Sequence, residues 1–149
     1  MNKWHAIIEI PQGDTRRRHW NAKKQVFVDL GPLSAFISCN EGMSPAHYGF
    51  IQNTRNIADN DEVDVIVISS SQYKVGERLA VTPIALLERE DADHKVVAVP
   101  IEEDTSWHDL SLEKKQLLQD FFAYTSAIVK IAGPDETVEY LLRSQVRQN

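Results

Sequence analysis

The sequence has very little cysteine and no long apolar run. Cys39 is the only cysteine in the 149 residues, so an intramolecular disulfide and a cysteine-rich zinc site are both excluded. No apolar run approaches the ~20 residues of a membrane-spanning helix. The short apolar stretch near the N-terminus is interrupted by Glu9 and Pro11, unlike that of a signal peptide. We therefore expect a cytoplasmic protein that has no membrane partner.

Positive charge is also scarce. There are 16 lysines and arginines against 22 aspartates and glutamates, which leaves a net charge of -6. A nucleic-acid partner is not expected, because it would require a basic face. A phosphate substrate remains compatible with this charge if metal cations mediate its binding. The 42% apolar and 26% charged residues are ordinary for a globular protein, and the length predicts a single domain over residues 1–149.

Short apolar runs bounded by turn residues predict strands in the first two thirds of the chain. We expect them at residues 4–10, 25–30, 47–51, 63–69, 77–90 and 94–101. Residues 63–69 are apolar at successive positions, which is typical of a strand buried on both faces. Pro83 lies inside 77–90, where it predicts a bulge or a sheet edge.

The last third of the sequence changes its period. Apolar residues spaced three or four apart predict an amphipathic helix over about 112–131, with Ser111 as its N-cap. A second, short helix is expected to begin at Pro134. Strands first and helices last predict a mainly β fold with C-terminal helices, built as a small β-barrel or curled sheet with the helices packed outside.

Three aspartates stand within six positions in the stretch IADNDEVDVIVIS, residues 57–69. Asp59, Asp61 and Asp64 supply only oxygen ligands, which select hard cations such as Mg²⁺ or Mn²⁺. The alternative is an acidic surface turn. Asp64 favours the metal site, because an aspartate inside an apolar strand is costly to bury unless a specific partner compensates its charge.

Two further acidic features stand beside apolar strands. The stretch EREDADHK, residues 88–95, is either a solvated hairpin turn or a source of carboxylates for the same metals, with Lys95 offering an ammonium to a phosphate. Glu9 lies between isoleucines in residues 4–10. Period-2 alternation makes Glu9 either an outward-facing residue or a carboxylate aimed at a site in the mouth of a barrel.

These pieces together resemble the soluble family I inorganic pyrophosphatases over most of the chain. DNDEVDVIV, residues 59–67, is similar to the aspartate signature of that family and is the most specific of the motifs. The other segments that carry the resemblance are IIEIPQGD, PAHYGFIQNT, DADHKVVAVP and LLQDFFAY. The resemblance implies an OB-like five-stranded β-barrel flanked by α-helices. It also implies pyrophosphate as the substrate and a homo-oligomer, since bacterial members are usually hexamers.

The resemblance also implies roles for individual residues, carried over by position. Mg²⁺, with Mn²⁺ as the alternative, would be bound by Asp59, Asp61, Asp64 and Asp93, together with Asp91 or Glu90. Catalysis would use Asp61, as the general base or positioner of the attacking water, and Glu9. Phosphate oxygens would be contacted by Lys95, Tyr48 and the arginine run, in which Arg17 or Arg18 replaces a family lysine.

The sequence departs from the family at several phosphate-binding positions. Leu30 stands where the family has an arginine, Ser44 where it usually has a tyrosine, and Thr125-Ser126 where it has a tyrosine and a lysine. Three functions therefore remain open. The protein is a divergent Mg²⁺-dependent pyrophosphatase, a hydrolase of another phosphoanhydride or phosphoester, or a noncatalytic homologue that binds metal or phosphate.

Overall fold

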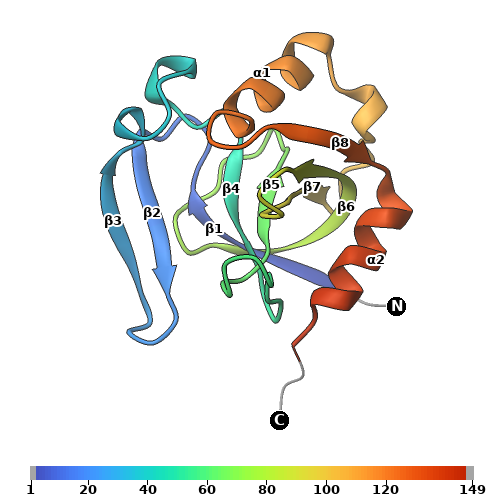
Figure 1. Ribbon diagram of the computed structural model, residues 1–149, viewed down its shortest axis with the longest axis horizontal. Coiled ribbons are helices and arrows are strands. Elements are labelled where there is room, and N and C mark those ends of the chain that lie inside the picture. Colours follow the sequence, from blue (N-terminus) through green and yellow to red (C-terminus); the bar gives the residue numbers. More distant parts are fainter. Residues whose placement is uncertain (1–2, 147–149) are drawn as a thin grey trace.

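A computed structural model describes residues 3–146, so the predicted domain over 1–149 extends beyond the described residues at both ends. Five strands form a closed barrel in the order β1-β4-β5-β7-β6 (Figure 1). They are β1 (Trp4–Ile10), β4 (His47–Ile51), β5 (Asp64–Val67), β6 (Arg78–Arg89) and β7 (Lys95–Pro100). Strand β1 pairs with both β4 and β6, and these two pairings close the sheet. The predicted five-stranded barrel is confirmed.

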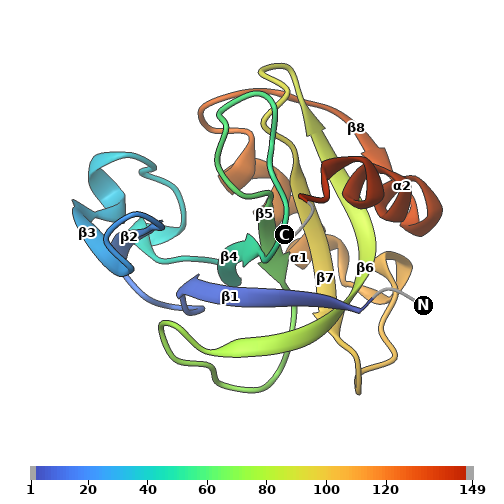
Figure 2. The same cartoon turned by 90° about the horizontal axis from the view of Figure 1, so that it is seen from below.

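Strand β6 is the longest strand and bends around the barrel (Figure 2). Its pairing with β7 shifts register between Pro83 and Ala85, which confirms the bulge predicted at the proline. Proline has no N–H to donate to a ladder, so a bulge is one of the few positions that a strand offers it. The bend allows β6 to pair with β1, β7 and β8 along its length.

The apolar core consists of two clusters on opposite faces of the barrel strands. The first cluster takes residues from all five strands, among them Ala6, Ile51, Val65, Val81 and Val96, and it fills the barrel. The second cluster takes the alternate residues of β5, β6 and β7. It packs against α1 (Leu112–Phe122), which lies outside the barrel. Burial on both faces explains the continuous apolar run of β5.

Strands β2 (Arg16–Asn21) and β3 (Val26–Pro32) form a separate hairpin beside the barrel (Figure 2). The strand predicted at residues 25–30 corresponds to β3, whereas β2 was not among the predicted strands. The segment that follows contains the 3-10 turns η1 (Leu33–Ala35) and η2 (Asn40–Gly42). A third 3-10 turn, η3 (Trp107–Asp109), precedes α1.

The prediction of one helix over residues 112–131 is wrong. Helix α1 ends at Phe122, and the chain then forms strand β8 (Ile128–Ala132), which pairs antiparallel with β6. The β-branched Ile128, Val129 and Ile131 suit a strand, and an available sheet edge outweighs weak helix propensity. The second helix, α2 (Pro134–Ser144), begins at Pro134 as predicted and buries Leu141. Within residues 3–146, no helix is both long and apolar enough to span a membrane.

Candidate functional site

A pocket of about 460 Å³ lies among the β2–β3 hairpin, the end of α1 and the ends of several barrel strands. Seven carboxylates line it: Glu9, Asp59, Asp61, Glu62, Asp64, Asp91 and Asp93. Among the described residues, four basic side chains line it as well: Arg17, Arg18, Arg89 and Lys95. Carboxylates this close repel one another, so the excess of negative charge favours bound cations.

The pocket lies on the outer face of the barrel rather than in its mouth. Asp64 precedes Ile66 by two residues in β5, and Lys95 precedes Val97 by two residues in β7. Side chains two apart in a strand share a face, and both Ile66 and Val97 belong to the cluster packed against α1. The site is therefore a polar continuation of the face that α1 covers.

Three of the carboxylates predicted as metal ligands lie close together. Asp59, Asp64 and Asp93 each place one carboxylate oxygen within 4.8 Å of the others. They come from the loop before β5, the start of β5 and the turn between β6 and β7. Burial raises the pKa of Asp59, and the negative charges of Asp93 and Asp61 add to this effect. Three oxygen ligands this close suit a hard divalent cation, so the donor set fits the metal that the sequence predicts.

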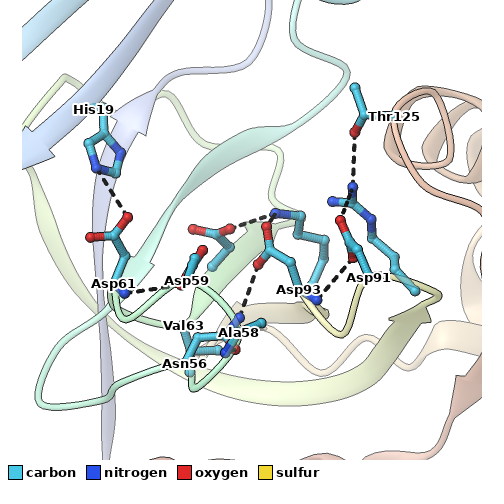
Figure 3. A network of polar contacts seen from close by, with 12 residues as sticks. His19, Asn56, Ala58, Asp59, Asp61, Val63, Asp91, Asp93 and Thr125 are labelled. Atoms are coloured by element: carbon cyan, nitrogen blue, oxygen red, sulfur yellow. Dashed lines mark hydrogen bonds and ion pairs between the residues drawn. The ribbon is translucent and has the colours of Figure 1, made fainter.

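Asp61 lies beside this cluster and faces His19 (Figure 3). Its backbone N–H donates to Asp59 Oδ1 at 3.0 Å, across Asn60 in the left-handed conformation (φ 61). The Asp61 side chain is 52% exposed, and its Oδ2 lies 3.6 Å from His19 Nε2. His19 was not among the site residues predicted from the sequence. Strand alternation places it on the same face as Arg17, and that signal could have identified it.

Lys95 is buried among the carboxylates that it accompanies. Its Nζ donates to Asp64 Oδ2 at 2.5 Å and to Asp93 Oδ2 at 3.1 Å. Burial by itself lowers the pKa of Lys95, but Tyr48, Asp64 and Asp93 raise it above its ordinary value. The Tyr48 ring lies 5.6 Å from Nζ, and burial raises the pKa of its hydroxyl. The ammonium therefore offsets part of the negative charge of this cluster.

Glu9 is the extra residue of a β-bulge. The register of β1 against β4 shifts between Ile8 and Ile10, so Glu9 stands unpaired between them. Bulges re-aim a side chain, and here the glutamate points into the pocket, where it is only 3% exposed. Its Oε2 accepts from the Trp20 N–H at 2.7 Å and lies 3.7 Å from His19 Nδ1. Burial raises the pKa of Glu9 to about 8, although the Trp20 hydrogen bond opposes the shift.

Two residues of the arginine run line the pocket. Arg18 donates to Asp14 Oδ2 at 2.6 Å, and the Arg17 guanidinium lies 4.2 Å from the centre of the Phe36 ring. Arg16 instead pairs with Asp29 at the exposed side of the hairpin. Arg17 or Arg18 was predicted to replace a family lysine, and the positions of both side chains in the pocket are compatible with that prediction.

Arg89 is a pocket residue that was not predicted from the sequence. It ends β6, is 7% exposed, and donates through Nη2 to Asp91 Oδ2 at 3.1 Å and to Thr125 Oγ1 at 2.9 Å. Asp91 lies at the far side of the polar network from Asp61 (Figure 3). A signal was present in the sequence, because Arg89 follows the buried Leu87 by two residues and shares its face.

The positions that depart from the family pattern differ in where they lie and in what they contact. Leu30 is 44% exposed and does not line the pocket. Ser44 is a buried pocket residue whose hydroxyl donates to the Ala46 carbonyl at 2.6 Å. The Ser126 hydroxyl accepts from the Asp91 N–H at 3.1 Å, while Thr125 accepts from Arg89. Three of these four positions therefore contribute to the pocket or to its support.

Solved structures of known proteins share this fold. Inorganic pyrophosphatase of Neisseria gonorrhoeae superposes with a TM-score of 0.83 at 23% identity, covering 94% of this chain and 87% of that chain. The enzyme of Thermus thermophilus gives a TM-score of 0.81, also at 23% identity, covering 94% of this chain and 87% of that one. The identities are low, so these likenesses show the fold alone.

The sequence comparisons go further than the fold. Inorganic pyrophosphatase of Sulfolobus acidocaldarius is 31% identical over 157 aligned positions, which cover 95% of this chain and 87% of the relative. That of Aeropyrum pernix is 46% identical over 100 positions, covering 64% of this chain and 53% of the relative. A family model described as inorganic pyrophosphatase matches residues 6–139. With this match over most of its length, the chain belongs to the inorganic pyrophosphatase family.

Proposed function

We propose that this protein hydrolyses inorganic pyrophosphate to two phosphates and uses a divalent cation, Mg²⁺ or, as the alternative, Mn²⁺. The observation that carries the proposal is the set of oxygens from Asp59, Asp64 and Asp93 within 4.8 Å of one another, beside the Lys95 ammonium. Membership in the family supports the reaction. The oxygen-only donors of the cluster support the choice of a hard cation.

Asp59, Asp64 and Asp93 are the proposed metal ligands. A divalent cation in such a site neutralises pyrophosphate and lowers the pKa of a bound water. If Asp64 and Asp93 bound a cation, Lys95 would lose the two acceptors that it has in the metal-free protein. Its ammonium could then donate to a phosphate oxygen, which is the substrate role that the sequence predicts for Lys95. The buried, protonated hydroxyl of Tyr48 supplies a second donor beside it.

Asp61 and Glu9 are the proposed catalytic carboxylates. Asp61 is half-exposed at the edge of the cluster, where it can accept a proton from an attacking water. Glu9 holds a proton near neutral pH while no metal is bound, because burial raises its pKa to about 8. His19 lies within 3.7 Å of Glu9 and within 3.6 Å of Asp61, and thus links the two carboxylates.

Arg17 and Arg18 are proposed to contact the substrate from the hairpin side of the pocket. A guanidinium donates through a planar fork that matches the spacing of phosphate oxygens. Asp91 was predicted as a metal ligand, but its carboxylate already accepts from Arg89 and from the Asp93 N–H. These bonds favour a role for Asp91 in holding Arg89.

Assembly and compartment complete the proposal. We expect a homo-oligomer, in the first instance a hexamer like those of bacterial relatives, in the cytoplasm. Ile57 and Leu112 are 96% and 83% exposed, and an interface between copies would bury such residues. A sequence with a single cysteine is unlike the disulfide-rich small domains of oxidising compartments. Light scattering and cell fractionation test these two expectations.

The activity is tested by phosphate release from pyrophosphate with Mg²⁺, with Mn²⁺ and with a chelator. The native protein is compared with Asp61→Asn, Asp64→Asn and the control Asp29→Asn, which changes an exposed hairpin carboxylate outside the pocket. We expect metal-dependent release that falls roughly 100-fold or more in the two pocket variants and is unchanged in the control.

Leu30 favours a second candidate, a noncatalytic homologue, because that side chain offers no phosphate contact and lies outside the pocket. Tight Mg²⁺ binding without turnover on any phosphoanhydride would support this candidate. Release from nucleotides or polyphosphate, but not from pyrophosphate, would instead indicate a different substrate on the same site.

A further inference from the structure

The Arg89 guanidinium is held in the pocket wall with part of its hydrogen-bonding capacity unused. Its side chain is 6% exposed, and its recorded bonds to Asp91 and Thr125 all use Nη2. Among the described residues, Nε is buried without any hydrogen-bond partner. A guanidinium carries five N–H donors, and leaving donors of a buried cation unpaired costs free energy. Because Arg89 lines the pocket, an anion bound there would lie against this cation.

The neighbours of Arg89 hold it in place. Asp91 Oδ2 accepts from Arg89, and Asp91 Oδ1 accepts from the Asp93 N–H at 3.0 Å. The Asp91 N–H in turn donates to the Ser126 hydroxyl. Thr125 adds a second acceptor for Nη2 at 2.9 Å. The hydroxyls of Thr125 and Ser126 thus hold the turn between β6 and β7 in place, and this turn holds the Arg89 guanidinium.

The surroundings of Arg89 suit an anion. It shares the pocket with the proposed metal ligands Asp59, Asp64 and Asp93, and the apolar rings of Phe121 and Phe122 also line this pocket. An apolar wall keeps water away and strengthens the attraction between a guanidinium and a phosphate. Only one carboxylate, Asp91, is paired with Arg89 among the residues described, and its side chain is 43% exposed.

We infer that Arg89 is a phosphate-binding residue. Its guanidinium binds a terminal phosphate of the substrate at the end of the pocket opposite Asp61. The identity of that substrate rests on the proposed function. The family pattern places a basic side chain at position 126, where this chain has serine. Arg89 supplies a cation from strand β6 instead, and Thr125 and Ser126 serve to orient it.

The test compares Arg89→Met, which removes the charge, with Arg89→Lys, which keeps the charge but loses the planar fork. Arg16→Met is the matched control, because Arg16 pairs with an exposed carboxylate and does not line the pocket. Binding of inorganic phosphate in the presence of Mg²⁺ is measured by calorimetry, since this probe is not consumed. Pyrophosphate hydrolysis and thermal unfolding are measured on the same samples.

We expect Arg89→Met to weaken phosphate binding roughly tenfold or more, with a smaller loss in Arg89→Lys and none in Arg16→Met. If Arg89→Met does not fold, the phosphate affinities of Arg89→Lys and of the native protein are compared, and this comparison tests the inference. Equal phosphate affinity in folded variants and native protein overturns the inference, as does a native protein that binds no phosphate. Arg89-dependent binding without pyrophosphate hydrolysis would uphold the inference and reject the proposed function.

Discussion

Asp64 and Lys95 face each other in register across the parallel strands β5 and β7, and the Lys95 Nζ lies 2.5 Å from Asp64 Oδ2. This pair answers the question of how an aspartate at the start of an apolar strand is tolerated. Burial of a carboxylate is costly unless it is paired, and the adjacent strand supplies the partner. The same lysine also bonds Asp93, so it stands where a divalent cation would compete for the same oxygens.

Replacement of Lys95 by methionine is expected to destabilise the metal-free protein. Breaking a buried ion pair leaves an uncompensated charge, which typically costs about 3–5 kcal/mol. Mg²⁺ should restore part of this loss, because it neutralises the two carboxylates in place of the lysine. Thermal unfolding with Mg²⁺ and with a chelator measures the effect. Lys130→Met, at an exposed ion pair, serves as the control, and an equal loss there would contradict the argument.

Metal binding is expected to raise the unfolding temperature. Asp59→Asn should separate the repulsion among the carboxylates from their binding of the metal. The substitution relieves repulsion from Asp93 and Asp61, so it should stabilise the protein when a chelator is present. It also removes a metal ligand, so it should weaken the stabilisation by Mg²⁺. A cation present at 100 times its dissociation constant stabilises by about 2.7 kcal/mol. An Mg²⁺ titration that is unchanged by the substitution would exclude Asp59 as a ligand.

The stability of the metal-free protein is expected to fall as pH rises from about 4.5 to about 8, because of Glu9. The folded state keeps the Glu9 proton up to its pKa of about 8, whereas the unfolded chain loses that proton near 4.5. In this window the unfolded state binds fewer protons, so the free energy of unfolding decreases with pH. Glu9→Gln keeps an acceptor for the Trp20 N–H and removes the titration. Denaturant unfolding at several pH values should show a flatter profile in the variant than in the native protein.

Gly49→Ala is expected to disrupt the pairing of β1 with β4. A Cβ at position 49 would overlap the carbonyl oxygen of Ile7, which is backbone and cannot move aside cheaply. The strain should both destabilise the fold and displace the Glu9 bulge, which pairs with this part of β4. The measurements are thermal unfolding and Mg²⁺-dependent turnover. Gly133→Ala is the control, because nothing lies within 4 Å of a Cβ there.

The five barrel strands and the aspartate cluster could be predicted from the sequence because their signals are local. Apolar runs, Pro83 and the spacing of Asp59, Asp61 and Asp64 are properties of short segments, and each segment adopts the local structure that they indicate. The helix over 112–131 could not be judged in this way. Ile128 and Val129 form a strand because β6 offers an unpaired edge, and that edge exists only in the assembled sheet.

The sequence by itself determined the family, the barrel and the oxygen-only donors, since motif order, periodicity and side-chain chemistry are all written along the chain. Only the tertiary structure decided which carboxylates meet. Asp93 joins Asp59 and Asp64 because the turn between β6 and β7 lies beside the start of β5, while Asp61 turns toward His19. It also decided that Arg89 meets Thr125, 36 residues away, because distances between remote side chains depend on how the strands are paired.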